Sequence, residues 1–354
     1  MEPFRVAFVI SAQNLADEGS LQAENLLRAW QGDADIVAST VRLSGQPLTS
    51  LLLRLPDLAR ADVVHLLPSS SSSFIGHTLP ALAIARMLGR PVILGGGDQH
   101  GNGDFSVSAT VRHALRGVAR TVVPSSVMAD ALGRVGIRAT MIPNVVQPEA
   151  FPVVDRHPLR PRLLSVRNFE PLDNVATTIR AFEIVQQRWP DATLTLVGRG
   201  SQDTNLRALA ADLGLRHVVF AGPRDQADLP AVYADHDVFV QSANVDNVPT
   251  AMLRAFAAGL PVVSTRAGGV EAVLTHGATG LLAPLADYET LAHHVLRMLA
   301  NPEHARCLAR AARATCAAFT WPRVREQWLH VYHGAARPRG RTHREVAAPL
   351  TSRS

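Results

Sequence analysis

The chain contains no lysine, so all 35 of its permanently basic side chains are arginine. Set against 30 acidic residues, they give a formal net charge of +5 and an isoelectric point near 10.1. The arginines are spread along the chain, and no basic stripe interleaved with aromatic residues precedes the C-terminal tail, which argues against a nucleic-acid partner. A coding bias toward Arg and Ala is the simpler explanation of the missing lysine. Anionic small molecules and membrane surfaces stay open as partners.

Cysteine and long apolar runs are also scarce. Cys307 and Cys316 are the only two cysteines, and their spacing fits one helix rather than a pair of metal ligands. We therefore expect no metal site and a reducing compartment. No apolar run could span a bilayer, and the first run, residues 6–10, is too short for the apolar part of a signal peptide. We expect a cytoplasmic protein, with a peripheral membrane location as the alternative.

Aromatic residues make up only 5% of the 354 residues, so the core must come mainly from Ala, Val, Leu and Ile. Short apolar runs alternate with helical patterns along the chain, which is typical of parallel strands covered by helices on both faces. The first series of predicted strands is 6–10, 63–67, 92–94, 121–123 and 139–142. The second series is 163–166, 194–197, 218–220, 238–240, 262–264 and 280–282. This pattern predicts an α/β protein with two doubly wound sheets.

Four prolines between residues 148 and 161 indicate a linker between the two series. The predicted parts are a first domain over 1–155, a second over 156–320, a helix over 321–336 that packs back toward the first domain, and a disordered basic tail over 337–354. Ligands of open α/β sheets bind beyond the carboxyl ends of the strands. Two such domains facing each other therefore predict a binding cleft between them.

Several helix ends can be predicted from single residues. Asn174 and Asp287 are suited to cap the helices that follow them, and Gly214 is suited to end the helix that begins at Asp203. Trp321, Trp328 and their neighbours recur at helical spacing near the end of the chain, and such an aromatic stripe indicates core packing.

The strongest local signal for a binding site is the segment 242–250, Ser-Ala-Asn-Val-Asp-Asn-Val-Pro-Thr. It lies between a predicted strand and a predicted helix over 250–258, and Pro249 suits the first turn of that helix. Amides without helical partners, together with the helix dipole, form an anion site at such a helix start. Gly268 and Gly269, after the next strand, permit a tight turn and a close backbone approach to a ligand.

From Asp246 to Leu282 the sequence resembles the donor-binding core of the group 1 glycosyltransferases, also called family four. Members carry an acidic residue, seven others and a glutamate, followed by Ala-Phe/Met-Ala-x-Gly-x-Pro-Val-Val and a Gly-Gly turn. Further matches are Gly198-Arg199-Gly200, Phe220-Ala221-Gly222 and Trp321-Pro322, with looser ones in the N-terminal half. The resemblance implies the GT-B fold, in which two Rossmann-like domains with parallel sheets face each other across a cleft.

The resemblance also implies a function. A sugar moves from a nucleotide-diphosphate sugar to an acceptor with retention of anomeric configuration, and neither a metal nor another cofactor is needed. The donor binds the C-terminal domain, and the acceptor binds the N-terminal domain. Family members hold the leaving diphosphate with positive side chains and helix-start amides, which stabilise its developing charge. We therefore expect an electropositive pocket beginning at Asp246.

Site residues follow from matching the family motifs. Arg167 matches the phosphate-binding arginine, and Asp246 matches the acidic residue that contacts the donor sugar. From the residues alone, Arg167 is equally an exposed loop arginine and Asp246 a helix cap. We assign Asp98 and His100, together with Gln99, to contacts with the sugar or the acceptor. The expected donor-binding residues are Gly198, Gly200, Gly222, Arg224, Asn247, Val248, Pro249, Thr250 and Arg254.

Some positions depart from the family pattern. The second family glutamate falls on Arg254, the family lysine falls near Leu172 or Asp173, and the family histidine falls about three residues before His100. A guanidinium donates hydrogen bonds and accepts none, so Arg254 reverses the polarity of that contact. One hypothesis is that Arg254, one helical turn after Thr250, supplies the missing cation to a phosphate at the helix start.

Three classes of function remain after these departures. The leading hypothesis is a glycosyltransferase with an unknown acceptor. The altered donor-site positions favour the alternative, a catalytically degenerate homologue that binds a nucleotide sugar or serves as a scaffold. An enzyme that isomerises or hydrolyses nucleotide sugars would need a fuller acid/base set.

Residues 69–73, five serines, replace a segment that helps hold the acceptor, and we interpret them as a solvated loop. Weak contact of the basic tail with anionic lipid stays open.

Overall fold

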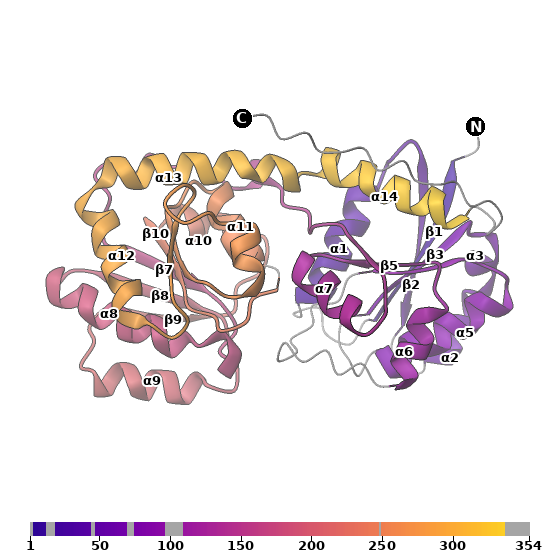
Figure 1. The fold of residues 1–354 in the computed structure, drawn as a ribbon, viewed down its shortest axis with the longest axis horizontal. Helices are drawn as coiled ribbons and strands as arrows, with labels where there is room; N and C mark the ends of the chain where they lie inside the picture. The colour runs from indigo at the N-terminus through magenta and orange to yellow at the C-terminus, as the bar shows by residue number, and fades with distance from the viewer. Residues whose placement is uncertain are drawn as a thin grey trace.

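The computed structural model describes residues 3–11, 18–43, 47–68, 74–95, 109–247 and 249–336. Within them the chain forms two parallel six-stranded sheets, each accompanied by helices, in two lobes that lie side by side (Figure 1). Several predictions lie outside the described residues: Asp98, His100, Val248, the serine run 69–73 and the tail 337–354.

The sheet of the N-terminal lobe has the order β2-β1-β3-β4-β5-β6, and all its neighbouring strands are parallel. Its strands are β1 (Phe4–Ser11), β2 (Ile36–Leu43), β3 (Val63–Leu67), β4 (Val92–Leu94), β5 (Arg120–Val123) and β6 (Ala139–Met141). The connecting helices are α1 (Glu18–Trp30), α2 (Pro47–Leu53), α3 (Leu55–Arg60), η1 (Phe74–Thr78), α5 (Leu79–Met87), α6 (Ala109–Arg116) and α7 (Ser126–Arg134). The chain adds β2 beside β1 and then crosses to β3 on the other side of β1.

The sheet of the C-terminal lobe has the order β12-β11-β10-β7-β8-β9. Its strands are β7 (Arg162–Val166), β8 (Thr193–Val197), β9 (Val218–Gly222), β10 (Val238–Gln241), β11 (Val262–Thr265) and β12 (Leu281–Ala283). Its main helices are α8 (Val175–Arg188), α9 (Asp203–Asp212), α10 (Leu229–Ala234), α11 (Thr250–Ala257), α12 (Tyr288–Ala300) and α13 (Pro302–Thr315). Short 3-10 segments are η2 (Pro148–Ala150), η3 (Pro171–Asp173), η4 (Gly268–Ala272) and η5 (Cys316–Phe319). The first strand, β7, is central, and the chain moves out to β9 before crossing back to β10.

All eleven strands predicted from apolar runs are present, with ends that move by two residues at most. The strand that the sequence missed is β2, whose residues Ile-Val-Ala-Ser-Thr-Val-Arg-Leu mix polar and apolar side chains. It pairs with β1 alone, at the edge of its sheet, and much of it is not fully buried. An edge strand needs no continuous apolar run, so that criterion finds only strands covered on both faces.

The predicted helix ends are mostly confirmed. The Asp287 Oδ1 accepts from the Thr290 amide at 2.9 Å at the start of α12, and Gly214 follows α9 with a φ of 62°. Asn174 does precede α8, but the prediction of a side-chain cap there is wrong. Asn174 adopts a left-handed conformation with a φ of 44°, and its Nδ2 donates to the Asn244 Oδ1 at 3.0 Å.

The last helix, α14 (Trp321–Ala336), follows the C-terminal lobe in the chain but lies along the N-terminal lobe, as Figure 1 shows in yellow. Its buried side chains Trp328 and Tyr332 join Phe8 and Trp30 in one hydrophobic cluster, so the aromatic stripe is core packing. The Arg325 guanidinium fixes the helix further, because it donates to Asp33 at 2.6 and 2.9 Å. Among the described helices, none has the length and apolarity that a membrane span requires.

Candidate active site

Arg167 and Asp246 meet where the strand order of the C-terminal sheet reverses. Arg167 directly follows β7, and Asp246 lies in the loop after β10, which pairs with β7. The carboxyl ends of parallel strands at such a reversal form the usual ligand crevice of doubly wound sheets. The Arg167 Nη1 donates to the Asp246 Oδ2 at 3.1 Å, although 79 residues separate the two in the chain. Their side chains are 12% and 4% exposed, so the pair is largely buried.

A second carboxylate holds the other side of the same guanidinium. The Asp173 Oδ1 lies 2.8 Å from the Arg167 Nη2, and its side chain is 9% exposed. The Gln241 Nε2, at the end of β10, donates to the Asp246 Oδ2 at 3.1 Å. Arg167 therefore faces two carboxylates, one of them near the position of the family lysine. This cluster is not the electropositive start of a pocket that the sequence led us to expect at Asp246.

Glycines after β8 allow the backbone around Arg167 to take its place. A Cβ atom at Gly198 would lie 1.9 Å from the Arg167 carbonyl oxygen, and the φ of Gly198 is 147°. A Cβ atom at Gly200 would lie 2.5 Å from the Phe169 carbonyl oxygen. Such distances exclude any larger residue, so the two glycines have a positioning role for the loop that carries Arg167.

The Gly-Gly turn after β11 supports the loop of Asp246. The Gly269 amide donates to the Asp246 carbonyl oxygen at 2.7 Å, and a Cβ atom at Gly269 would lie 2.4 Å from the Asn247 carbonyl oxygen. Gly268 has a φ of 42°. The close approach that these glycines permit is thus to the protein's own loop, whereas the sequence had suggested a ligand.

Helix α11 begins at Thr250, immediately after this loop. Pro249 occupies the cap position, and the Asp246 carboxylate bonds to Arg167 and Gln241, so the interpretation of Asp246 as a helix cap is wrong. All eight residues of the helix are buried, including the polar Thr250 and Arg254, which are 2% and 9% exposed.

Two cavities lie beside the start of α11. One, of about 240 Å³, is lined by Thr250 and Arg254 from the C-terminal lobe and by Asn25 and Arg28 from α1. The other, of about 250 Å³, is lined by Asn247 and Pro249, by residues of η4 and α7, and by Met141, Pro143 and Asn144. Because both lobes line both cavities, the cleft between the two sheets that the fold class predicts is present.

Other predicted residues stand apart from the Arg167 cluster. Arg224 is exposed, and Gly222 meets the cluster only through its carbonyl oxygen, which accepts from the Gly198 amide at 3.1 Å. Sequence reasoning noted Asp173 only as a place near which the family lysine is missing, and it did not predict the ion pair of Asp173 with Arg167. It also missed the place of Arg28 in the cleft, because Arg28 belongs to no motif. Within the described part of the chain, no cluster of His, Cys, Asp and Glu could hold a metal ion.

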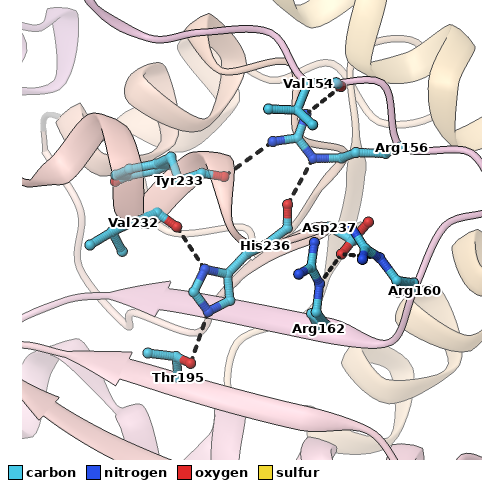
Figure 2. A network of polar contacts seen from close by, with 9 residues as sticks. All are labelled: Val154, Arg156, Arg160, Arg162, Thr195, Val232, Tyr233, His236 and Asp237. Carbon is cyan, nitrogen blue, oxygen red and sulfur yellow. Dashed lines mark hydrogen bonds and ion pairs between the residues drawn. The ribbon is translucent and has the colours of Figure 1, made fainter.

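The linker that joins the lobes is tied to helix ends of the C-terminal lobe, and Figure 2 shows the bonds from Arg156 to Val154, Tyr233 and His236. The buried Arg156 guanidinium donates to the carbonyl oxygens of Val154, Tyr233, His236 and Ala258 at 2.7–3.1 Å. Burial lowers the pKa of Arg156, an effect that the nearby Asp237 carboxylate opposes. Tyr233 is in α10 and Ala258 ends α11, so this one side chain fixes the carboxyl ends of both helices to the linker.

Residues 147–315 match the family model described as Glycosyl transferases group 1. This match covers just under half of the chain, so its C-terminal region is similar to the group 1 glycosyltransferases. It is 32% identical over 162 residues to the GDP-mannose-dependent alpha-(1-6)-phosphatidylinositol monomannoside mannosyltransferase of Mycolicibacterium smegmatis, which is 44% of this chain and 42% of the relative. It is 31% identical over 176 residues to the D-inositol 3-phosphate glycosyltransferase of Saccharomonospora viridis, which is 47% of this chain and 41% of the relative.

These alignments span less than half the length of either curated relative. A solved structure extends the likeness of fold to both lobes of the chain. The crystal structure of Anabaena Alr3699/HepE in complex with UDP and glucose superposes with a TM-score of 0.73 at 17% identity, covering 93% of this chain and 99% of that one. At this identity the likeness shows the shared GT-B fold.

Proposed function

We propose that the protein transfers a sugar from a nucleotide-diphosphate sugar to an acceptor and retains the anomeric configuration of the sugar. The observation that carries the proposal is the contact between Arg167 and Asp246 at the reversal of the C-terminal sheet, four residues before α11 begins. Both side chains match the family's donor motif. The neighbours support the nature of the donor, because Anabaena Alr3699/HepE was crystallised with UDP and, in another crystal, with UDP-glucose.

In this mechanism the donor sugar lies against Asp246, whose carboxylate accepts hydrogen bonds from sugar hydroxyls. The bond from the anomeric carbon to the diphosphate breaks, and the bond from that carbon to the acceptor oxygen forms on the same face. The acceptor proton passes to an oxygen of the departing diphosphate. The dipole at the start of α11 stabilises the charge that develops on this leaving group.

The test is an incubation of the full chain with UDP-, GDP- and TDP-sugars, with and without candidate acceptors. We expect release of a nucleoside diphosphate and a glycosylated product from at least one pair, and NMR of the product gives its anomeric configuration. A product of inverted configuration would contradict the proposed retention but not the proposed sugar transfer. Absence of release across the panel, with no thermal shift by any donor, would contradict transfer.

A second candidate function is a homologue that binds a nucleotide sugar without transferring it. It is favoured by the two carboxylates that hold Arg167 and by Arg254 at the position of the second family glutamate. In the same incubation this candidate predicts a thermal shift with a donor and no release of nucleoside diphosphate with any acceptor.

A further inference from the structure

The cavity of about 240 Å³ beside α11, here called the junction cavity, lies where both lobes meet the linker. Its walls are α1, the linker, the segment that leads into α10, and the first turns of α11. The residues that line it are Asn25, Arg28, Val145, Val146, Gln147, Ala150, Phe151, Gln226, Ala227, Pro230, Thr250 and Arg254. None of them is acidic, and two are arginines, so the cavity is electropositive.

Arg254 is the more buried of these two arginines, at 9% exposed. Among the residues that the structure describes, none forms a hydrogen bond or an ion pair with its guanidinium. A buried charge normally has a partner, because removal from water is costly unless an opposite charge and hydrogen bonds compensate. The nitrogens of the Arg254 guanidinium are not among the fully buried side-chain atoms that lack a partner, and Arg254 lines the cavity. The five N–H groups of the side chain are therefore available to an acceptor in the cavity, either water or a ligand.

Arg28 brings a second positive charge from the other lobe. Its side chain is 62% exposed, and its ion pair with Glu24 on the same helix is long, at 3.7 Å. Such an exposed pair is weak and leaves the guanidinium able to turn toward a ligand. A hydrogen bond joins the two lobes at this cavity, because the Gln226 Nε2 of the C-terminal lobe donates to the Asn25 Oδ1 of α1 at 3.1 Å.

The charge around Arg254 is the reverse of that around Arg167. Two carboxylates lie within 3.1 Å of the Arg167 guanidinium, whereas none of the described residues that line the cavity around Arg254 is acidic. An anion in the cleft is repelled by Asp173 and Asp246 and attracted by Arg254 and Arg28.

We propose that the junction cavity binds a phosphoryl group, with Arg254 as its main ligand and Arg28 as the ligand from the opposite lobe. The planar fork of a guanidinium matches two phosphoryl oxygens, and such charge-assisted pairs are the strong ones. The phosphoryl group belongs either to a nucleotide donor or to an acceptor that carries its own phosphate. The proposal that the cavity binds a phosphoryl group rests on the geometry of the cavity. Only the assignment of that group to a donor or to an acceptor rests on the proposed function.

Calorimetry of the full chain with inorganic phosphate and with pyrophosphate tests the site at constant ionic strength. Arg254→Gln is expected to weaken binding by about tenfold to a hundredfold, the usual loss for a hydrogen bond to a charged group. Arg28→Gln is expected to weaken it by about two- to fivefold, because that side chain is exposed. The matched control is Arg207→Gln on the distant helix α9, where the arginine is exposed and paired with Asp203, and we expect unchanged binding there.

Equal phosphate affinity in Arg254→Gln and the wild type overturns the proposal, as does absence of phosphate and pyrophosphate binding by the wild type. Equal affinity in Arg28→Gln overturns the contribution of the second lobe. Arg254→Lys keeps the charge but loses the fork, and intermediate binding by this variant supports the geometry. Because Arg28 is exposed, its variant also tests the site if substitution of the buried Arg254 prevents folding.

A repeat of the titration with saturating UDP identifies the source. Loss of phosphate binding assigns the site to the donor's phosphates, and simultaneous binding assigns it to a phosphate on the acceptor. Phosphate binding that depends on Arg254, without product from any donor and acceptor, supports the site and contradicts the proposed transfer. Product formation with phosphate binding unchanged in Arg254→Gln supports transfer and contradicts the site.

Discussion

Arg167, which is largely buried, and Arg254, which is buried, both lie close to the start of α11, yet their surroundings are opposite. Arg167 is held between Asp173 and Asp246, which come from η3 and from the loop after β10. Arg254 has no such partner among the described residues and faces a cavity lined by both lobes. The first arginine is part of a closed charge cluster, and the second faces the space where a ligand can enter.

This difference shows that a residue can match the family motif without adding unbalanced charge to the cleft, and can break the motif while adding it. Arg167 keeps the residue type that the family motif requires, but its charge is balanced within the protein. Arg254 breaks the motif, yet it brings to the cleft a positive charge that has no counterion among the described residues. The following predictions test this contrast, from the largest expected effect to the smallest.

Replacing Arg167 with methionine is expected to have the largest effect on stability. It leaves the buried carboxylates of Asp173 and Asp246 near each other without their shared cation, and breaking such a buried pair costs about 3–5 kcal/mol of unfolding free energy. Urea denaturation followed by circular dichroism measures the loss. A loss below about 1 kcal/mol, the usual value for an exposed pair, would show that water already screens this cluster.

Replacing Asp246 with asparagine tests whether the same cluster also acts on the substrate. If the carboxylate binds the donor sugar in the transition state, kcat/KM should fall by about 10²–10³-fold, as for other single groups that stabilise developing charge. Asp212→Asn, at an exposed position at the end of α9, serves as the control. A drop in stability with kcat/KM unchanged would assign Asp246 to a structural role only.

A change at Gly198 should disturb the Arg167 cluster through its backbone. Gly198→Ala places a Cβ atom 1.9 Å from the Arg167 carbonyl oxygen at a φ of 147°, so we expect a loss of about 3 kcal/mol. The matched control is Gly222→Ala, at a φ of 69° with open space around the new atom, for which about 1–2 kcal/mol is expected. Equal losses in the two variants, measured by urea denaturation, would mean that close packing at Gly198 is unimportant.

The fold was predictable because most strands are buried on both faces. Continuous apolar runs such as Val63–Leu67 follow directly from that burial, and the prolines between 148 and 161 separate the two sheets. The edge strand β2 was not predicted, because its own residue pattern mixes polar and apolar side chains and its pairing partner, β1, lies 25 or more residues away in the chain. Local sequence does not record a partner that only the topology provides.

The site was predictable only in part. Motif spacing placed Arg167 and Asp246 in one region, and the structure brings them into contact. The balance of charge could not be read in the same way, since it depends on which carboxylates lie within bonding distance of each guanidinium. Asp173 and Arg28 acquire their roles because η3 lies beside the loop after β7 and because α1 and α11 line the same cavity, which no linear pattern encodes.

The smallest expected effect is on the stability of the Arg254→Met variant. Because no described residue bonds to the Arg254 guanidinium, methionine removes a poorly compensated charge and leaves no carboxylate unpaired, so the unfolding free energy should change by less than about 1 kcal/mol. Urea denaturation in parallel with Arg167→Met makes the comparison direct, since both substitutions remove one buried arginine. A loss for Arg254→Met as large as that for Arg167→Met would mean that Arg254 has an internal partner after all, and its charge would then be unavailable to a ligand in the cleft.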